Sequence, residues 1–298
     1  MIPEARGQTG REAAKLGGML FLAVAVAFAA ISVVWAHELR SPRVTLLGSG
    51  ANALSVLVTT GGARLLIATG DQPIAFGNAL ERARHPIARR LDIVLIAGQG
   101  RDLLAPEAIA ADPGVGYLAT IGRLSPSPEA TALAAGGINA LTTSKRIQLD
   151  DHTTVDLDLE TTAEGGETVW RATIRRQATA VVVLSSAVAA SSFEWPGPVS
   201  ALVIAAGDEP ESAWDATPAP VLAFPNEATS DAGPREFFAA RDGPVWAVRV
   251  APGEAVRLGF GSNGLELAPA AAVPLGSSVS ARRRWPTSAG HGRTRPGS

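Results

Sequence analysis

Hydrophobic and polar positions divide the chain into an uncharged N-terminal stretch, a long body of short apolar runs and a polar tail. Residues 16–36 carry no charged side chain. At 1.5 Å per helical residue, this stretch covers roughly 30 Å, the thickness of a bilayer's hydrocarbon core. The basic residues that precede it are Arg6, Arg11 and Lys15. Basic flanks favour the cytoplasmic side of a membrane. The pattern therefore predicts a cytoplasmic N-terminus (1–15), a single transmembrane signal anchor (16–36) and a main domain outside the cytoplasm.

A cleaved signal peptide is an alternative interpretation of the same stretch, because Val34-Trp35-Ala36 loosely resembles a cleavage site. Signal-peptide cores usually run for about 7–15 apolar residues, and this stretch is longer. A buried helix of a soluble domain is the third alternative. The length of the stretch favours the uncleaved anchor.

From residue 43 onward the pattern changes to short β-rich runs. A pair of glycines at 61–62 is typical of a two-residue hairpin. A helix is predicted over 73–85, with proline at its first position. The residues expected on its apolar face are Phe76, Leu80 and Ala83. Further helices are expected at 106–111, 128–135 and 234–241. The strand predictions are 43–47, 54–60, 63–69, 91–97, 116–120, 168–175, 179–184, 201–205, 245–250, 255–260 and 262–267.

Composition and charge exclude several kinds of site. The 298 residues include four histidines and no cysteine, so disulfides and thiolate metal sites are excluded. Residues 1–43 carry a net charge of +2 and residues 281–298 carry +5, which leaves −9 for the rest because the whole chain is at −2. A body at −9 matches a phosphate backbone poorly. Nucleic acid is therefore expected only as a weak partner, through the arginines of the tail: Arg282, Arg283 and Arg284.

Three motifs along the body resemble a known family. Residues 47–53 read Leu-Gly-Ser-Gly-Ala-Asn-Ala, residues 66–70 read Leu-Ile-Ala-Thr-Gly, and an apolar strand runs into Ala-Gly-Gln-Gly-Arg-Asp-Leu at 97–103. Their order resembles the metallo-β-lactamase-like fold of the C-terminal domain in competence DNA-uptake proteins of the ComEC type. The resemblance implies an α/β domain, a four-layer αββα sandwich, over residues 43–268. The remaining 269–298 are expected to form a disordered basic tail.

The residues that bind metal in that family are replaced in this chain. The family carries the motifs Asp-Val-Gly-Gln-Gly-Asp-Ala and Thr-His-x-His-x-Asp-His, and the second of them binds metal. In this chain the first motif has lost both acids, and the second has lost its histidines and keeps only Asp102. The resemblance places the lost ligands at Gly98, Gly100, Leu103, Ala187, Ala205 and Ala206. Neither glycine nor alanine offers a side-chain donor to a metal ion. The expectation is therefore a domain without catalytic residues, metal or cofactor, with a binding or scaffolding role and a link to DNA uptake.

Two enzyme interpretations stay open beside this one. A metal-dependent hydrolase or phosphodiesterase could use displaced ligands, although Asp150-Asp151-His152 is interpreted as a solvated turn. Residues 48–53 also match a Gly-x-Gly-x-x-Ala dinucleotide fingerprint, with Asp71 about 20 residues later. That fingerprint requires a helix directly after the glycines, whereas residues 54–60 are rich in β-branched side chains.

Overall fold

A computed structural model describes the chain in separate ranges. These are residues 19, 21–29, 32, 41–84, 90–98, 109, 114–122, 131, 136–161, 168–186, 189, 192–207, 219–225, 236–240, 243–261, 264–269 and 283–284. Two compact units are distinguished, Met1–Ser41 and Pro42–Ser298. In the first unit, residues 21–29 are helical, and the hydroxyl of Ser32 donates to the carbonyl of Phe28 at 2.8 Å. Among the described residues, no helix is long and apolar enough to cross a membrane. Half of the expected anchor at 16–36 lies outside them.

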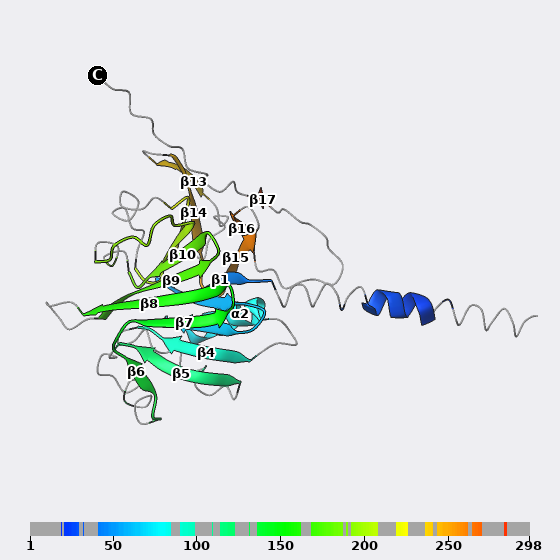
Figure 1. The fold of residues 1–298 in the computed structure, drawn as a ribbon, viewed down its shortest axis with the longest axis horizontal. Coiled ribbons are helices and arrows are strands. Elements are labelled where there is room, and N and C mark those ends of the chain that lie inside the picture. The colour runs from blue at the N-terminus through cyan, green and yellow to red at the C-terminus, as the bar shows by residue number, and fades with distance from the viewer. Residues whose placement is uncertain are drawn as a thin grey trace, which may run out of the picture. The chain divides into compact units, whose positions relative to one another are not determined.

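The second unit is built from two β-sheets (Figure 1). Within the described residues, the first sheet has nine strands in the order β17-β16-β15-β1-β2-β3-β4-β5-β6, and the second has eight in the order β13-β14-β12-β11-β10-β9-β8-β7. The strands of the first sheet are β1 Arg43–Gly50, β2 Ala53–Thr59, β3 Arg64–Ala68, β4 Leu91–Ile96, β5 Val115–Ile121, β6 Asn139–Leu141, β15 Ala255–Gly261, β16 Gly264–Pro269 and β17 Arg283–Arg284. Those of the second are β7 Lys145–Asp150, β8 Thr153–Thr161, β9 Thr168–Arg176, β10 Thr179–Leu184, β11 Ala201–Ile204, β12 Val221–Pro225, β13 Glu236–Ala240 and β14 Gly243–Val250.

The two sheets pack face to face over one hydrophobic core. The first sheet contributes side chains such as Leu46 and Val56, and the second contributes Leu157 and Val183, each at most 1% exposed. Successive side chains of a strand point to opposite faces, and β8 obeys this alternation. Its apolar residues enter the core, while Asp156 and Asp158 lie on the outer face. The central strands β10 and β11 are apolar and almost fully buried, as expected of parallel strands covered on both faces.

Helix α2 (Pro73–Ala83) covers the outer face of the first sheet. Its buried residues include Phe76, Leu80 and Ala83, as the spacing predicts. The outer face of the second sheet is covered in part by a non-helical segment that includes Phe193, Trp195 and Val199. Three layers of the expected αββα arrangement are therefore present. A second helical layer is not found among the described residues.

A turn at residues 251–254 joins β14 to β15 and packs directly on β1. The N–H of Gly48 donates to the carbonyl of Glu254 at 2.9 Å, and the N–H of Gly253 donates to the carbonyl of Gly48 at 2.9 Å. Arg82 of α2 donates to the carbonyl of Gly253 at 2.9 Å. A Cβ added to Gly48 would lie 1.9 Å from the carbonyl oxygen of Ala251. Strand β1 can therefore carry this turn only because residue 48 has no side chain.

The structure corrects one expected element and leaves others undescribed. The helix expected at 234–241 is wrong, because Glu236–Ala240 forms β13, which pairs antiparallel with β14. In the predicted helices at 106–111 and 128–135, only residues 109 and 131 are described, and both are helical. In the expected tail, Arg283–Arg284 pairs with Glu266–Leu267. The rest of that tail lies outside the described residues.

Candidate functional site

The motifs that carry the family resemblance meet at one corner of the sandwich. There the two sheets are joined by backbone pairing, since Ala53 at the start of β2 forms an antiparallel bridge with Ala206, just after β11. The N–H of Leu54 donates to the carbonyl of Ala205 at 2.7 Å, and the N–H of Gly207 donates to the carbonyl of Asn52 at 3.0 Å. We call this region, residues 52–54, 68, 97–98 and 205–207, the strand-end corner.

The ends of the parallel strands β3 and β4 complete the strand-end corner. Ala97, directly after β4, donates its N–H to the carbonyl of Ala68, the last residue of β3, at 2.8 Å. Gly98 follows with a φ of 153°. The side chains of Ala68, Ala97 and Ala205 are each at most 1% exposed. The sequence correctly predicts strands over 63–69 and 91–97, and the structure adds that these two parallel strands end side by side.

The described residues of the strand-end corner do not fit a metal ion. Zinc and manganese sites use imidazole, thiolate or carboxylate ligands, and Ala68, Gly98, Ala205 and Ala206 offer none of these. Across the part of the chain that the structure describes, no group of three or more His, Cys, Asp or Glu side chains is arranged to hold a metal. The predicted positions Gly100, Asp102, Leu103 and Ala187 lie outside the described residues.

The turn between β7 and β8 contains Asp150-Asp151-His152. The Asp150 carboxylate accepts a hydrogen bond from the His152 N–H at 2.8 Å and lies 3.3 Å from the Arg176 guanidinium. Burial acts to raise the pKa of Asp150, but the hydrogen bonds from His152 and Thr153 and the charge of Arg176 outweigh it. The net effect is a lowered pKa. The Asp150 carboxylate therefore has its partners within the turn and the neighbouring strand β9, and the tripeptide forms the turn that the sequence predicts.

The dinucleotide alternative requires a helix after the Gly-x-Gly motif at 48–50. The structure places β2 there instead, antiparallel to β1 and paired with it from Arg43 to Gly50. No helix N-terminus follows the glycines to receive a pyrophosphate. The dinucleotide-binding interpretation is therefore wrong.

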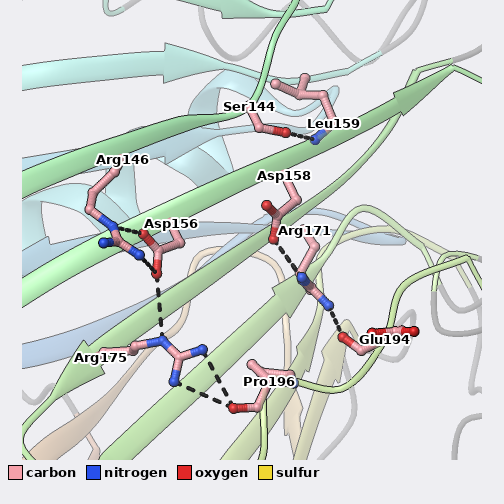
Figure 2. Close-up of polar contacts among 9 residues, drawn as sticks. All are labelled: Ser144, Arg146, Asp156, Asp158, Leu159, Arg171, Arg175, Glu194 and Pro196. Atoms are coloured by element: carbon pink, nitrogen blue, oxygen red, sulfur yellow. Dashed lines mark hydrogen bonds and ion pairs between the residues drawn. The ribbon is translucent and has the colours of Figure 1, made fainter.

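A second candidate site lies on the outer face of the second sheet, where sequence reasoning identified none. It is an open groove of about 570 Å³ over β7, β8 and β9, bounded by the segment 194–196. We call it the β7–β9 groove; Figure 2 shows its polar contacts. The charged residues that line it are Lys145, Arg146, Asp156, Asp158, Arg171, Arg175 and Glu194.

Strand register determines how the charges of the β7–β9 groove pair. Arg146 lies directly across from Asp156, and its Nε and Nη2 donate to that carboxylate at 2.5 and 3.2 Å. The hydrogen bond to Asp156, reinforced by the negative charge, raises the pKa of Arg146. Arg175 approaches the same carboxylate at 3.5 Å. Two guanidinium groups thus share one acid on this face (Figure 2).

Arg171 forms one end of the groove and is fully engaged. It lies across from Asp158 and donates to it through Nε at 3.0 Å and through Nη2 at 2.5 Å. Its Nη1 donates to the carbonyl of Glu194, and its guanidinium lies 4.9 Å from the ring centre of Phe193. These contacts attach the covering segment to β9.

Comparisons with known proteins identify similar structures but no family. No family model matches the sequence, and no curated protein matches it. The solved structures that the chain resembles include three metallo-β-lactamases. For MIM-2 the TM-score is 0.34 at 15% identity, over 48% of this chain and 58% of that enzyme; the chain thus spans little more than half of its length. For MEM-A1, a subclass B3 enzyme from a soil metagenome library, the TM-score is 0.37 at 9% identity, over 59% and 84%. For Rm3 it is 0.28 at 14% identity, over 60% and 76%. At TM-scores below 0.5, this likeness transfers neither an active site nor an activity to this chain.

Proposed function

We propose that residues 43–268 form a metallo-β-lactamase-like domain without metal-dependent hydrolysis, which acts as a binding or scaffolding module. The order of elements supports the fold assignment, because two face-to-face sheets begin with the β1–β3 meander and α2 and close with the β15–β16 hairpin. The observation that carries the functional proposal is the strand-end corner. The ends of β3, β4 and β11 meet there, and their residues offer alanine and glycine instead of metal ligands. Such hydrolysis needs a bound cation to generate hydroxide at neutral pH.

Metal analysis of the purified full chain tests this proposal. We expect zinc and manganese far below one equivalent after incubation with either ion and gel filtration. We also expect no phosphodiesterase or β-lactam hydrolysis above background with added manganese. An Asp102→Ala variant should give the same values. Stoichiometric metal that Asp102→Ala removes would contradict the proposal and favour the alternative, a hydrolase with displaced ligands.

The proposal places this domain outside the cytoplasm at the cell membrane, held by residues 16–36. The uncharged stretch supports it, as do the exposed apolar side chains on its described helical residues, including Phe21 at 77% and Phe28 at 71%. We expect the expressed chain to stay in the membrane fraction after carbonate washing, and a chain beginning at residue 41 to be released. Release of the full chain would argue for a cleaved or soluble segment.

The proposed link to competence and DNA uptake rests on the ComEC-type motifs, and its nucleic-acid part rests on the arginines at 282–284. The acidic body argues against a DNA-binding surface on the sandwich itself. We expect the purified full chain to bind single-stranded DNA weakly. The affinity should fall as the salt concentration rises, and binding should be lost when these arginines are replaced. Its absence would leave a protein partner as the proposed ligand.

A further inference from the structure

We propose that the β7–β9 groove binds a small phosphate-type oxyanion. The site lies on the outer face of the second sheet and is built from other residues than the strand-end corner. The inference goes beyond the proposed function, because anion binding there needs no metal and does not depend on whether the domain hydrolyses anything. Three observations support the inference: the excess of positive charge in the groove, the exposure of its cationic side chains, and a buried hydroxyl group without a hydrogen-bond partner.

Positive charge in the β7–β9 groove exceeds what its carboxylates neutralise. Four cationic residues face three acidic ones, and Asp158 is taken up by Arg171. The Lys145 ammonium group makes no ion pair or hydrogen bond within the described part of the chain. Arg146 and Arg175 share Asp156 and remain 72% and 41% exposed. The unused donors of these three residues are therefore available to a ligand.

The guanidinium groups offer the geometry that phosphate recognition requires. A guanidinium presents several N–H donors in one plane, which matches two oxygens of a phosphate. Arg175 holds its backbone partner loosely, since both terminal nitrogens lie 3.5 Å from the Pro196 carbonyl oxygen. Arg171, by contrast, is only 13% exposed and keeps its contacts to Asp158 and Glu194. Arg171 is thus a positioning residue, while Arg146, Arg175 and Lys145 would touch the anion.

A buried hydroxyl group provides the second, independent observation. Thr173 lines the groove, lies between Arg171 and Arg175 on the same face of β9, and is 1% exposed. Its Oγ1 has no hydrogen-bond partner within the described part of the chain. A buried hydroxyl without a partner destabilises the folded state, so such groups are rare in folded proteins. An oxyanion held by the neighbouring arginines would accept the missing hydrogen bond.

Calorimetric titration of the full chain with inorganic phosphate tests the inference. The titration contains EDTA, so that phosphate cannot bind through a metal ion. It is run at constant ionic strength, so that the screening of charges is the same at every point. We expect saturable binding of one phosphate per chain and at least tenfold weaker binding of acetate. No saturable binding would overturn the proposal, and equal binding of acetate would overturn the phosphate assignment. Failure of this experiment leaves the metal analysis unaffected.

Matched variants connect the binding to the β7–β9 groove. Arg146→Gln, Arg175→Gln and Lys145→Gln should each weaken phosphate binding about tenfold or more. Arg90→Gln is the control, because Arg90 is 71% exposed and pairs with an aspartate, like Arg146, but lies outside the groove. Equal effects of Arg90→Gln and Arg146→Gln would overturn the site.

The Thr173→Val variant separates a ligand contact from a structural role. It removes the unsatisfied hydroxyl and keeps the side-chain shape, so the Tm should hold or rise. Phosphate binding should fall several-fold in the same protein. Unchanged phosphate binding would show that the hydroxyl does not face the anion and would overturn its part in the site.

Discussion

Gly48→Ala is expected to destabilise the sandwich at or above the upper end of the roughly 1–3 kcal/mol typical of overpacking. The new Cβ would lie 1.9 Å from the Ala251 carbonyl oxygen and 2.7 Å from its carbon. Both atoms belong to the backbone, so no side-chain rotation relieves the overlap. The 251–254 turn must move, which disturbs both of its hydrogen bonds with Gly48 and the bond from Arg82. Urea denaturation of the two proteins, compared by their midpoints, measures the loss.

Gly77→Ala is the matched control for the Gly48 substitution. Gly77 lies inside α2, and a Cβ added there meets no atom within 4 Å. Glycine in a helix costs about 0.5–1 kcal/mol relative to alanine, so this substitution should raise the midpoint. Opposite signs for the two substitutions would support the packing explanation. A Gly48→Ala protein as stable as the parent would show that the turn does not press on β1.

Phe76→Ala is expected to cost about 3–5 kcal/mol, the usual range for emptying an aromatic core position. Phe76 is 1% exposed and packs with Leu47, Leu66 and Val94 between α2 and the first sheet. Its removal leaves a cavity in the layer that attaches the helix. Since domains of this kind are stable by about 5–15 kcal/mol, the loss is a large share of the total. Thermal unfolding followed by circular dichroism should show a clear drop in Tm.

Ile74→Ala is the comparison for Phe76, two residues earlier in the same helix. Ile74 is 81% exposed, so its truncation should change the free energy of unfolding by no more than about 0.5 kcal/mol. Phe76→Leu should fall between the two variants because it retains part of the buried volume. If Ile74→Ala proved as costly as Phe76→Ala, the outer side of α2 would have to be buried by another part of the protein.

The first third of the body is predictable because its patterns are local. Proline at the first helical position and apolar residues at helical spacing predict 73–85, and the helix runs from Pro73 to Ala83. Glycines at 61–62 predict the turn between β2 and β3, and these two strands pair antiparallel. In each case the deciding residues lie within one or two turns of each other. The packing of these elements in the folded domain agrees with the structure that their local sequence favours.

The expected helix at 234–241 is wrong because a strand that begins just outside its window decides this element. Its residues Glu236 to Ala240 include good helix formers, but they form the outermost strand beside β14. Pairing with the next strand along the chain, from Ala240 opposite Gly243 to Glu236 opposite Ala247, decides this element, and helix propensity is too weak a preference to resist it. The pattern of these eight residues does not show this outcome, because β14 is itself held in the sheet by parallel pairing with β12.

The β7–β9 groove could be anticipated only in part. Alternation along β8 places Asp156 and Asp158 on one face, and alternation along β9 does the same for Arg171 and Arg175. That signal predicts two charged outer faces. Which acid meets which arginine depends on strand register, and register is determined by the whole sandwich. The unsatisfied hydroxyl of Thr173 depends on the same register.

The bridge between Ala53 and Ala206 has a mechanical consequence. Over the shared core the two sheets touch through apolar side chains, whose attraction is not directional. At the strand-end corner they are connected by backbone hydrogen bonds, which break when stretched. A load that pulls β11 away from β2 is therefore resisted at this corner first. Within the described residues, the strand-end corner therefore joins the two sheets through their backbones, in addition to the side-chain contacts of the core.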